Sequence, residues 1–291
     1  MTSTTLHSTP RPRDVLLAQI RAVGLAPRGL APAAMAVVAL AALHITIELL
    51  KTGEVIAFHP ERQWLPGIVG LLLPIVVWRG EEPFGASFLW TLPVDRWRHA
   101  LAKVFAGWVW LMGGVALFVL WSFALTLLSG GNILAEETLR VLRSSLSASH
   151  TLSPAAVETV RWTPEPLLWL APFTSATATY LLASALGLAV RHPLRWIVGS
   201  VIGFFLVSGV GNVLEPLLES LFEGPYGLDA LLTARTTFLN IEVTLSTGDR
   251  VAVWRALPDA GQWATATLLW TGAGLASLLA ASSRHRESRR A

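Results

Sequence analysis

Two pairs of polar residues in otherwise apolar stretches are the first candidates for chemistry. His44 and Glu48 lie four residues apart within the apolar segment from Ala33 to Leu50, so a helix places them on one face. An ionisable pair at membrane depth marks a substrate or ion pathway, whereas the same pair near a helix end is an ordinary solvent-exposed ion pair at the membrane interface. Asn212 and Glu215, near the end of a later apolar segment, have the same two interpretations.

Motifs for catalysis and for cofactor binding are missing from the chain. No Gly is followed by Lys, which excludes a Walker-type nucleotide site, and neither H-E-x-x-H nor G-x-S-x-G occurs. The 7 histidines are scattered without ligand spacing, and the chain has no cysteine and only 3 methionines. We therefore expect no enzyme activity, no metal site and no cofactor bound by this chain.

The composition predicts a membrane protein. The chain has 291 residues, of which 53% are hydrophobic and 14% charged, whereas about a quarter are charged in ordinary soluble domains. A helix needs about 20 apolar residues to cross the bilayer. Six apolar segments mark the predicted spans, and most reach about that length, although the second is short on its own: Ala33 to Leu50, Leu65 to Trp78, Val104 to Ser129, Leu167 to Val190, Trp196 to Leu214 and Trp263 to Ser283. The predicted fold class is an all-α integral membrane protein with six transmembrane helices.

A charged step separates the second and third apolar segments. It runs from Glu81 to Lys103 and includes Glu82, Arg96 and Arg98. Each Asp, Lys or Arg at the centre of a membrane helix costs roughly 2.5 to 3.5 kcal/mol. The step therefore lies outside the hydrocarbon.

The distribution of basic residues predicts which side of the membrane the step occupies. Most of the 22 Lys and Arg residues fall in the terminal segments and in the connections after the second and fourth segments. Short basic connections stay in the cytoplasm, so both termini and the step are predicted to be cytoplasmic. This gives an N-terminal cytoplasmic segment (1–32), a transmembrane domain (33–283) and a basic cytoplasmic tail (284–291). The chain has no basic run interleaved with aromatic residues, so we expect no nucleic-acid partner.

The N-terminal segment contains an amphipathic stretch from Asp14 to Val23. Leu16, Ile20 and Val23 share one helical stripe. Because this stripe lies next to the first apolar segment, it predicts a helix in the membrane interface.

Two long extracytoplasmic loops, 130–166 and 215–262, are predicted to form a small α+β region. In the first loop, Asn132 as a cap and the i,i+4 pair Glu136 and Arg140 predict a helix. In the second loop, apolar residues alternate with mostly polar ones, and a Gly-containing turn follows. This pattern predicts a hairpin near 237–257. An isolated hairpin is marginal in water, so it should pack against the other loop or a partner.

Glycine and tryptophan mark two further features of the apolar segments. Gly199 and Gly203 form a G-x-x-x-G pattern in the fifth segment, which allows close helix contact either within the chain or in a dimer. Tryptophans stand at segment ends, as interfacial anchors do: they are Trp64, Trp78, Trp162, Trp169, Trp196 and Trp263.

Taken together, these features resemble the membrane permeases of type-2 ATP-binding cassette (ABC) transporters over nearly the whole chain. The most specific likeness is an acidic amphipathic helix after the second span, followed by L-P-V-x-R and a lysine that leads into the third. The elements of this step are Glu81, Glu82, the stretch Pro83 to Trp90, Leu92, Pro93, Val94, Arg96 and Lys103.

The resemblance implies that the step is a coupling helix that docks onto a separate cytoplasmic ATPase. The residues implied in that contact are Glu81, Glu82, Phe84, Phe88 and Leu89, while Leu92, Pro93, Val94, Arg96 and Lys103 form the re-entry into the membrane. It further implies two permease copies or siblings, two ATPases that carry ATP and Mg, location in the plasma (inner) membrane, and export of a lipid-like, drug-like or peptide substrate. In this family the first and fifth spans meet across the dimer, which gives Gly199 and Gly203 a role there.

Asp95 and Trp97 depart from the small polar or basic residues common in relatives, and both extracytoplasmic loops are long. An alternative from a different class is a non-transporting membrane scaffold or sensor whose loops bind a partner and whose step recruits a cytoplasmic protein.

Overall fold

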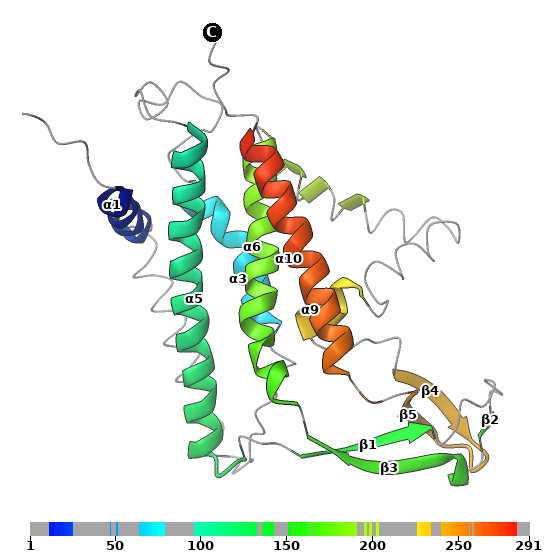
Figure 1. The fold of residues 1–291 in the computed structure, drawn as a ribbon. Helices are drawn as coiled ribbons and strands as arrows, with labels where there is room; N and C mark the ends of the chain where they lie inside the picture. Colours follow the sequence, from blue (N-terminus) through cyan, green and yellow to red (C-terminus); the bar gives the residue numbers. More distant parts are fainter. Residues whose placement is uncertain are drawn as a thin grey trace, which may run out of the picture.

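The computed structural model describes residues 12–25, 47, 51, 64–78, 96–132, 136–142, 151–152, 154–163, 165–190, 195–196, 198–199, 202–203, 226–233, 240–255, 257 and 259–283. Within these residues, four helices form a bundle: α3 (Leu65–Val77), α5 (Arg96–Leu128), α6 (Ala171–Ala189) and α10 (Ala260–Ser283). A helix α1 (Pro12–Leu25) lies against α5 near one end of the bundle, and a sheet lies at the other end (Figure 1). We call these the α1 end and the sheet end.

Two of these helices are long and apolar enough to cross a membrane. They are α5, over Trp97–Leu128, and α10. The 33 residues of α5 give a length of about 50 Å. Asp259 caps α10, because its Oδ1 accepts the N–H of Gly261 at 2.7 Å.

Helix α6 is the centre of the bundle because small residues let its neighbours approach closely. The Thr179 hydroxyl donates to the Gly67 carbonyl of α3 at 2.7 Å, and a Cβ at Gly70 would overlap the Ala176 carbonyl and the Thr179 hydroxyl. On α10, a Cβ at Gly274 would lie 2.9 Å from Leu181 Cβ. Glycine at these positions allows the close helix contacts typical of membrane bundles.

A five-stranded sheet of order β2-β4-β5-β1-β3 combines the two long loops. The first loop supplies β1 (Glu137–Leu142), β2 (Thr151–Leu152) and, after a short 3-10 turn at Pro154–Ala156, β3 (Val157–Trp162). The second loop supplies β4 (Asn240–Leu245) and β5 (Arg250–Trp254), which pair as a hairpin through the turn at Gly248.

The sequence-based hairpin is therefore confirmed, and so is its packing against the other loop. It is inserted between two strands of that loop: β5 runs parallel to β1 with Val141 opposite Trp254, and β4 runs parallel to β2 with Thr151 opposite Thr244.

The sheet sits on the first turns of α6 and α10. Leu139 and Trp162 of the sheet form one buried cluster with Ala171 of α6 and with Ala260 and Trp263 of α10. A 3-10 helix η3 (Pro166–Leu170) leads from β3 into α6 and adds Leu168 to the cluster. The sheet and these two helices thus share one core.

The prediction of a helix after Asn132 is wrong, because residues 137–142 form β1. Its expected i,i+4 pair is replaced by a contact across strands, because Arg161 of β3 lies 3.9 Å from Glu136. Leu139 has 8% of its surface exposed and packs in the shared core. Pairing with β3 and burial against α6 and α10 outweigh a local helix preference.

The second loop, predicted to lie wholly beyond the membrane, contains a short helix α9 (Leu228–Thr233) beside the bundle (Figure 1). Leu231 is fully buried, and Leu232 contacts α3 at Gly67. The first and fifth predicted spans fall mostly outside the described residues.

Candidate functional site

The charged step is the candidate site, and the structure describes its flanks. The predicted ATPase-contact residues (Glu81, Glu82, Phe84, Phe88 and Leu89) and Leu92, Pro93 and Val94 of the re-entry segment lie outside the described residues. Arg96 begins α5, and Lys103 lies two turns further along the same helix. The helix therefore starts within the charged re-entry segment, before the apolar stretch.

The two flanks of the step are held together by a buried cation and an indole ring. Lys103 Nζ on α5 lies 4.8 Å from the ring centroid of Trp78, the residue that ends α3. Lys103 is 5% exposed and Trp78 is 9% exposed, so the contact is shielded from solvent. A desolvated contact of this kind is worth about 2 kcal/mol. Trp78 was predicted to be an interfacial anchor, and it is instead part of the protein interior.

Directly beneath this contact, helices α3, α5 and α6 pack so closely that an added methyl group would not fit. The Tyr180 hydroxyl of α6 donates to the Val104 carbonyl of α5 at 2.8 Å. A Cβ at Gly107 would overlap that hydroxyl and lie 2.9 Å from Val77 Cγ2 of α3. Trp108 Nε1 also donates to Thr177 Oγ1 of α6 at 3.1 Å. Contacts this close make the three helices one rigid body at the α1 end.

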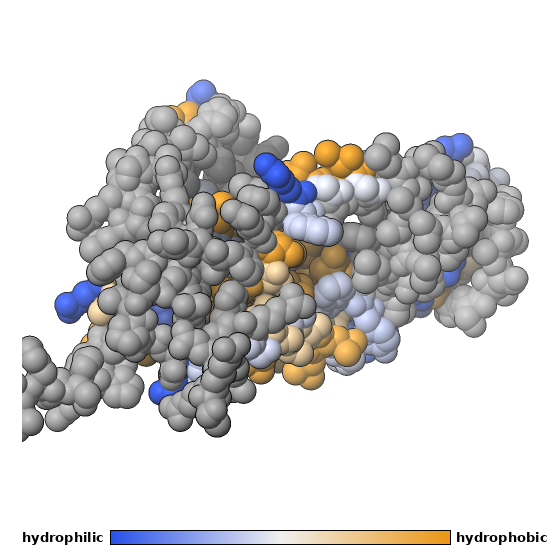
Figure 2. Space-filling model, turned by 90° about the horizontal axis from the view of Figure 1, so that it is seen from above, coloured by the Kyte–Doolittle hydropathy of each residue, from blue (hydrophilic) through white to orange (hydrophobic). Residues whose placement is uncertain are grey.

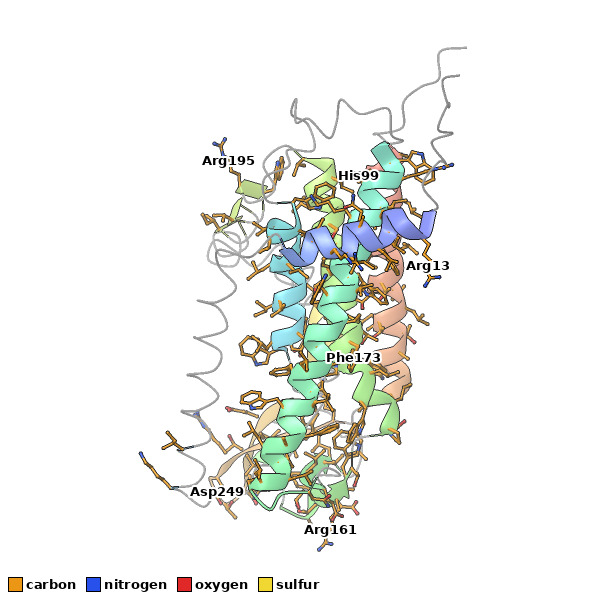
Figure 3. All side chains as sticks on the ribbon, turned by 90° about the vertical axis from the view of Figure 1, so that its left-hand side faces the viewer. Arg13, His99, Arg161, Phe173, Arg195 and Asp249 are labelled. Atoms are coloured by element: carbon orange, nitrogen blue, oxygen red, sulfur yellow. The ribbon has the colours of Figure 1, made fainter. Side chains whose placement is uncertain are left out.

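Helix α1 contacts the same part of α5 (Figure 3). Trp110 Nε1 donates to the Ile20 carbonyl at 2.8 Å, and a Cβ at Gly24 would overlap the Trp110 ring. Gln19 Nε2 lies 3.3 Å from His99 Nδ1. Val23 is buried in the core of the bundle, which confirms the amphipathic helix predicted for this segment.

Trp110→Phe is expected to release α1 from α5. The substitution keeps an aromatic ring but removes the N–H that donates to α1, which costs roughly 1 kcal/mol. Limited trypsin digestion in detergent should cleave faster after Arg13 and Arg21, both exposed on α1. Trp121→Phe, further along α5, is the control and should leave cleavage unchanged. Equal rates for both variants would contradict the docking role of Trp110.

The other predicted site residues are not brought to this region by the described structure. Gly199 and Gly203 are helical, and a Cβ on either would contact nothing within 4 Å. Their role in a dimer contact stays a prediction. The pathway candidates His44, Glu48, Asn212 and Glu215 lie outside the described residues.

The sequence did not single out Tyr180 and Gly107 as residues of this site. Tyr180 is one of only 2 tyrosines, and a tyrosine inside an apolar helix needs a partner for its hydroxyl. That signal was available, but the identity of the partner depends on how α5 and α6 pack. Among the described residues, no group of three His, Asp or Glu side chains could hold a metal ion.

No family model matches the chain, and neither the curated proteins nor the solved structures contain a match.

Proposed function

We propose that this chain is the membrane-spanning permease subunit of an ABC transporter that exports its substrate. In this proposal it has six spans, both termini are cytoplasmic, and two copies assemble with two separate ATPase subunits. The observation that carries the proposal is the buried contact between Trp78 and Lys103.

The contact joins α3 to α5 on either side of residues 79–95, which contain the proposed ATPase-contact part of the charged step, so a force on the step would reach α3 and α5 together. The packing of Tyr180 and Gly107 passes the same force to α6. Packed helices move between discrete arrangements and do not deform continuously. Nucleotide-driven closure of the ATPases would thereby switch the permease between inward and outward openings.

The charge distribution supports the proposed orientation. Arg13 and Arg195 lie toward the α1 end, whereas Arg161 and Asp249 lie in the sheet region (Figure 3). Seen from the α1 end, hydrophobic residues of the bundle lie between scattered, strongly hydrophilic ones (Figure 2). Basic residues in short connections favour the cytoplasmic side, so we propose that the α1 end faces the cytoplasm.

The length of α5 agrees with this assignment. At about 50 Å it exceeds the roughly 30 Å hydrocarbon core by several turns. We place its first turns, from Arg96 to Lys103, above the membrane surface, where they support the step.

Single cysteines in this cysteine-free chain should label from opposite sides. In sealed right-side-out vesicles, a membrane-impermeant maleimide is expected to modify Thr247→Cys, in the exposed hairpin turn, without permeabilisation. Arg13→Cys should react only after the vesicles are opened. Labelling of both cysteines in sealed vesicles would contradict the proposed topology.

Co-purification tests the function itself. The tagged full-length chain, extracted from its native membranes in mild detergent, is expected to bring down a Walker-motif ATPase that is identified by mass spectrometry and hydrolyses ATP. An unrelated tagged membrane protein from the same membranes is the control. Recovery of the chain without such an ATPase would contradict the proposal.

The five-stranded sheet favours a second candidate, a membrane scaffold or sensor that binds a partner outside the cell. A sheet assembled from two distant loops and sharing a core with α6 and α10 is a rigid platform for such a contact. The same co-purification distinguishes the two functions, because a sensor recruits no ATPase.

A further inference from the structure

Helix α1 crosses α5 at the level where the proposed membrane surface meets the bundle. Gln19 Nε2 lies 3.3 Å from His99 Nδ1, in the turns of α5 that we place above the surface. The Ile20 carbonyl accepts the N–H of Trp110 at 2.8 Å, about 16 Å further along α5. Figure 3 shows α1 lying across the bundle and not along it. In the proposed orientation, α1 therefore lies in the cytoplasmic surface of the membrane.

One face of α1 is occupied by this contact, and another is exposed. Ile20 and Val23 pack in the core of the bundle. Arg13, Leu17 and Arg21 are exposed and spaced i, i+4, i+8, so they form one stripe along the helix. Leu17 is 43% exposed, which places an apolar side chain between two guanidinium groups. Figure 3 shows Arg13 on the side of α1 that faces the sheet end, which is the bilayer side in the proposed orientation.

The charge of this stripe favours an anionic ligand. Among the residues that the structure describes, neither Arg13 nor Arg21 forms an ion pair. The N-terminal segment 1–32 contains four arginines and one acidic residue, Asp14, so its charge is positive overall. A guanidinium group matches the oxygens of a phosphate, and an exposed leucine beside it favours a ligand that also has an apolar part. Anionic lipids combine the two.

We propose that Arg13, Leu17 and Arg21 form a binding face for the phosphate headgroups of anionic lipids in the cytoplasmic leaflet. The arginines bind phosphate oxygens, and Leu17 enters the boundary between headgroups and acyl chains. Because α1 is bound to α5 through Trp110, a lipid on this face ties the first half of α5 to the membrane surface. The inference rests on the proposed orientation of the chain, whereas the binding step itself needs no ATPase.

A fluorescence titration tests this face. The cysteine-free chain allows an environment-sensitive fluorophore on a single Ala18→Cys, an exposed position next to Leu17. When the purified full-length chain in detergent is titrated with phosphatidylglycerol, we expect a saturable blue shift of the emission. Arg13→Gln combined with Arg21→Gln should raise the half-saturating lipid concentration by roughly tenfold or more. Arg140→Gln combined with Arg161→Gln makes the same change of charge on exposed strands at the sheet end and should titrate like wild type.

Two further variants separate charge from shape. Arg13→Lys combined with Arg21→Lys keeps both charges and should bind within a few-fold of wild type, while Leu17→Ser keeps them and should weaken binding. Equal half-saturation of wild type and the double glutamine variant, or an equal response to phosphatidylcholine, would overturn the inference. So would the same response to free glycerol phosphate, which has the anion without the acyl chains. Arginine-dependent lipid binding by a chain that recruits no ATPase would overturn the transporter proposal and leave the lipid site intact.

Discussion

Gly107→Ala is expected to destabilise the folded chain, because the added methyl group has no room at the α1 end. The added Cβ would overlap the Tyr180 hydroxyl and lie 2.9 Å from Val77 Cγ2. Tyr180 and Val77 are 0% and 2% exposed, so neither side chain can swing away into solvent. Overpacking of a closed core costs about 1 to 3 kcal/mol. The apparent melting temperature in detergent, followed by size-exclusion chromatography after heating, measures the loss.

A double-mutant cycle shows whether the loss comes from this overlap. Tyr180→Phe alone removes the hydrogen bond to the Val104 carbonyl, at a cost of roughly 1 kcal/mol. In that background Gly107→Ala should cost less than it does in the wild-type chain, because the hydroxyl that it meets is gone.

Gly113→Ala is the control, since a Cβ there contacts nothing within 4 Å. It should be neutral or slightly stabilising, because alanine favours a helix by up to about 1 kcal/mol over glycine. If Gly107→Ala lowers the melting temperature as much in the Tyr180→Phe background as in the wild-type chain, that result would contradict the packing described beneath the step. The same holds if Gly113→Ala lowers it as much as Gly107→Ala does.

Reversing the charge of the step is expected to abolish coupling to the ATPase. Glu81→Lys combined with Glu82→Lys places two positive charges where the proposal has an acidic docking surface. Truncating or reversing charges at a protein contact commonly costs 2 to 5 kcal/mol, so recovery of the ATPase should fall by roughly tenfold or more. The measurement is ATP hydrolysis recovered per mole of purified chain.

Glu158→Lys is the matched control for this pair. Glu158 is an exposed glutamate on β3 at the sheet end, so its reversal should leave the recovered ATPase activity at the wild-type level. The melting temperature of the chain should be unchanged in both variants, which separates lost docking from lost folding. Unchanged ATPase recovery with Glu81 and Glu82 reversed would contradict the docking role.

Elements with strong local patterns could be predicted from the sequence. The apolar stripe of α1 and the alternation and glycine turn of the β4–β5 hairpin depend on neighbouring residues, and the structure confirms both. The composition of α5 and α10 likewise predicted helices able to cross a membrane.

Elements that depend on contacts between residues distant in the sequence could not be predicted from it. Glu136 and Arg140 have the spacing of a helical pair, but Glu136 contacts Arg161 and the segment forms β1. The position of α9 depends on its packing against α6 and α10, which the pattern of its own short segment does not reveal. The contact between Trp78 and Lys103 joins residues on either side of the step, and only the packing of α3 against α5 brings them together.

Site-specific crosslinking in native membranes shows whether the step touches an ATPase, as we claim. Because the chain has no cysteine, a single Phe88→Cys can carry a photoactivatable maleimide in native membranes. Thr247→Cys, in the hairpin turn at the sheet end, is the control. We predict a covalent adduct between the Phe88→Cys chain and a Walker-motif ATPase, and none from Thr247→Cys. The same adducts from both positions, or no ATPase adduct from the step in membranes that contain one, would contradict the claim.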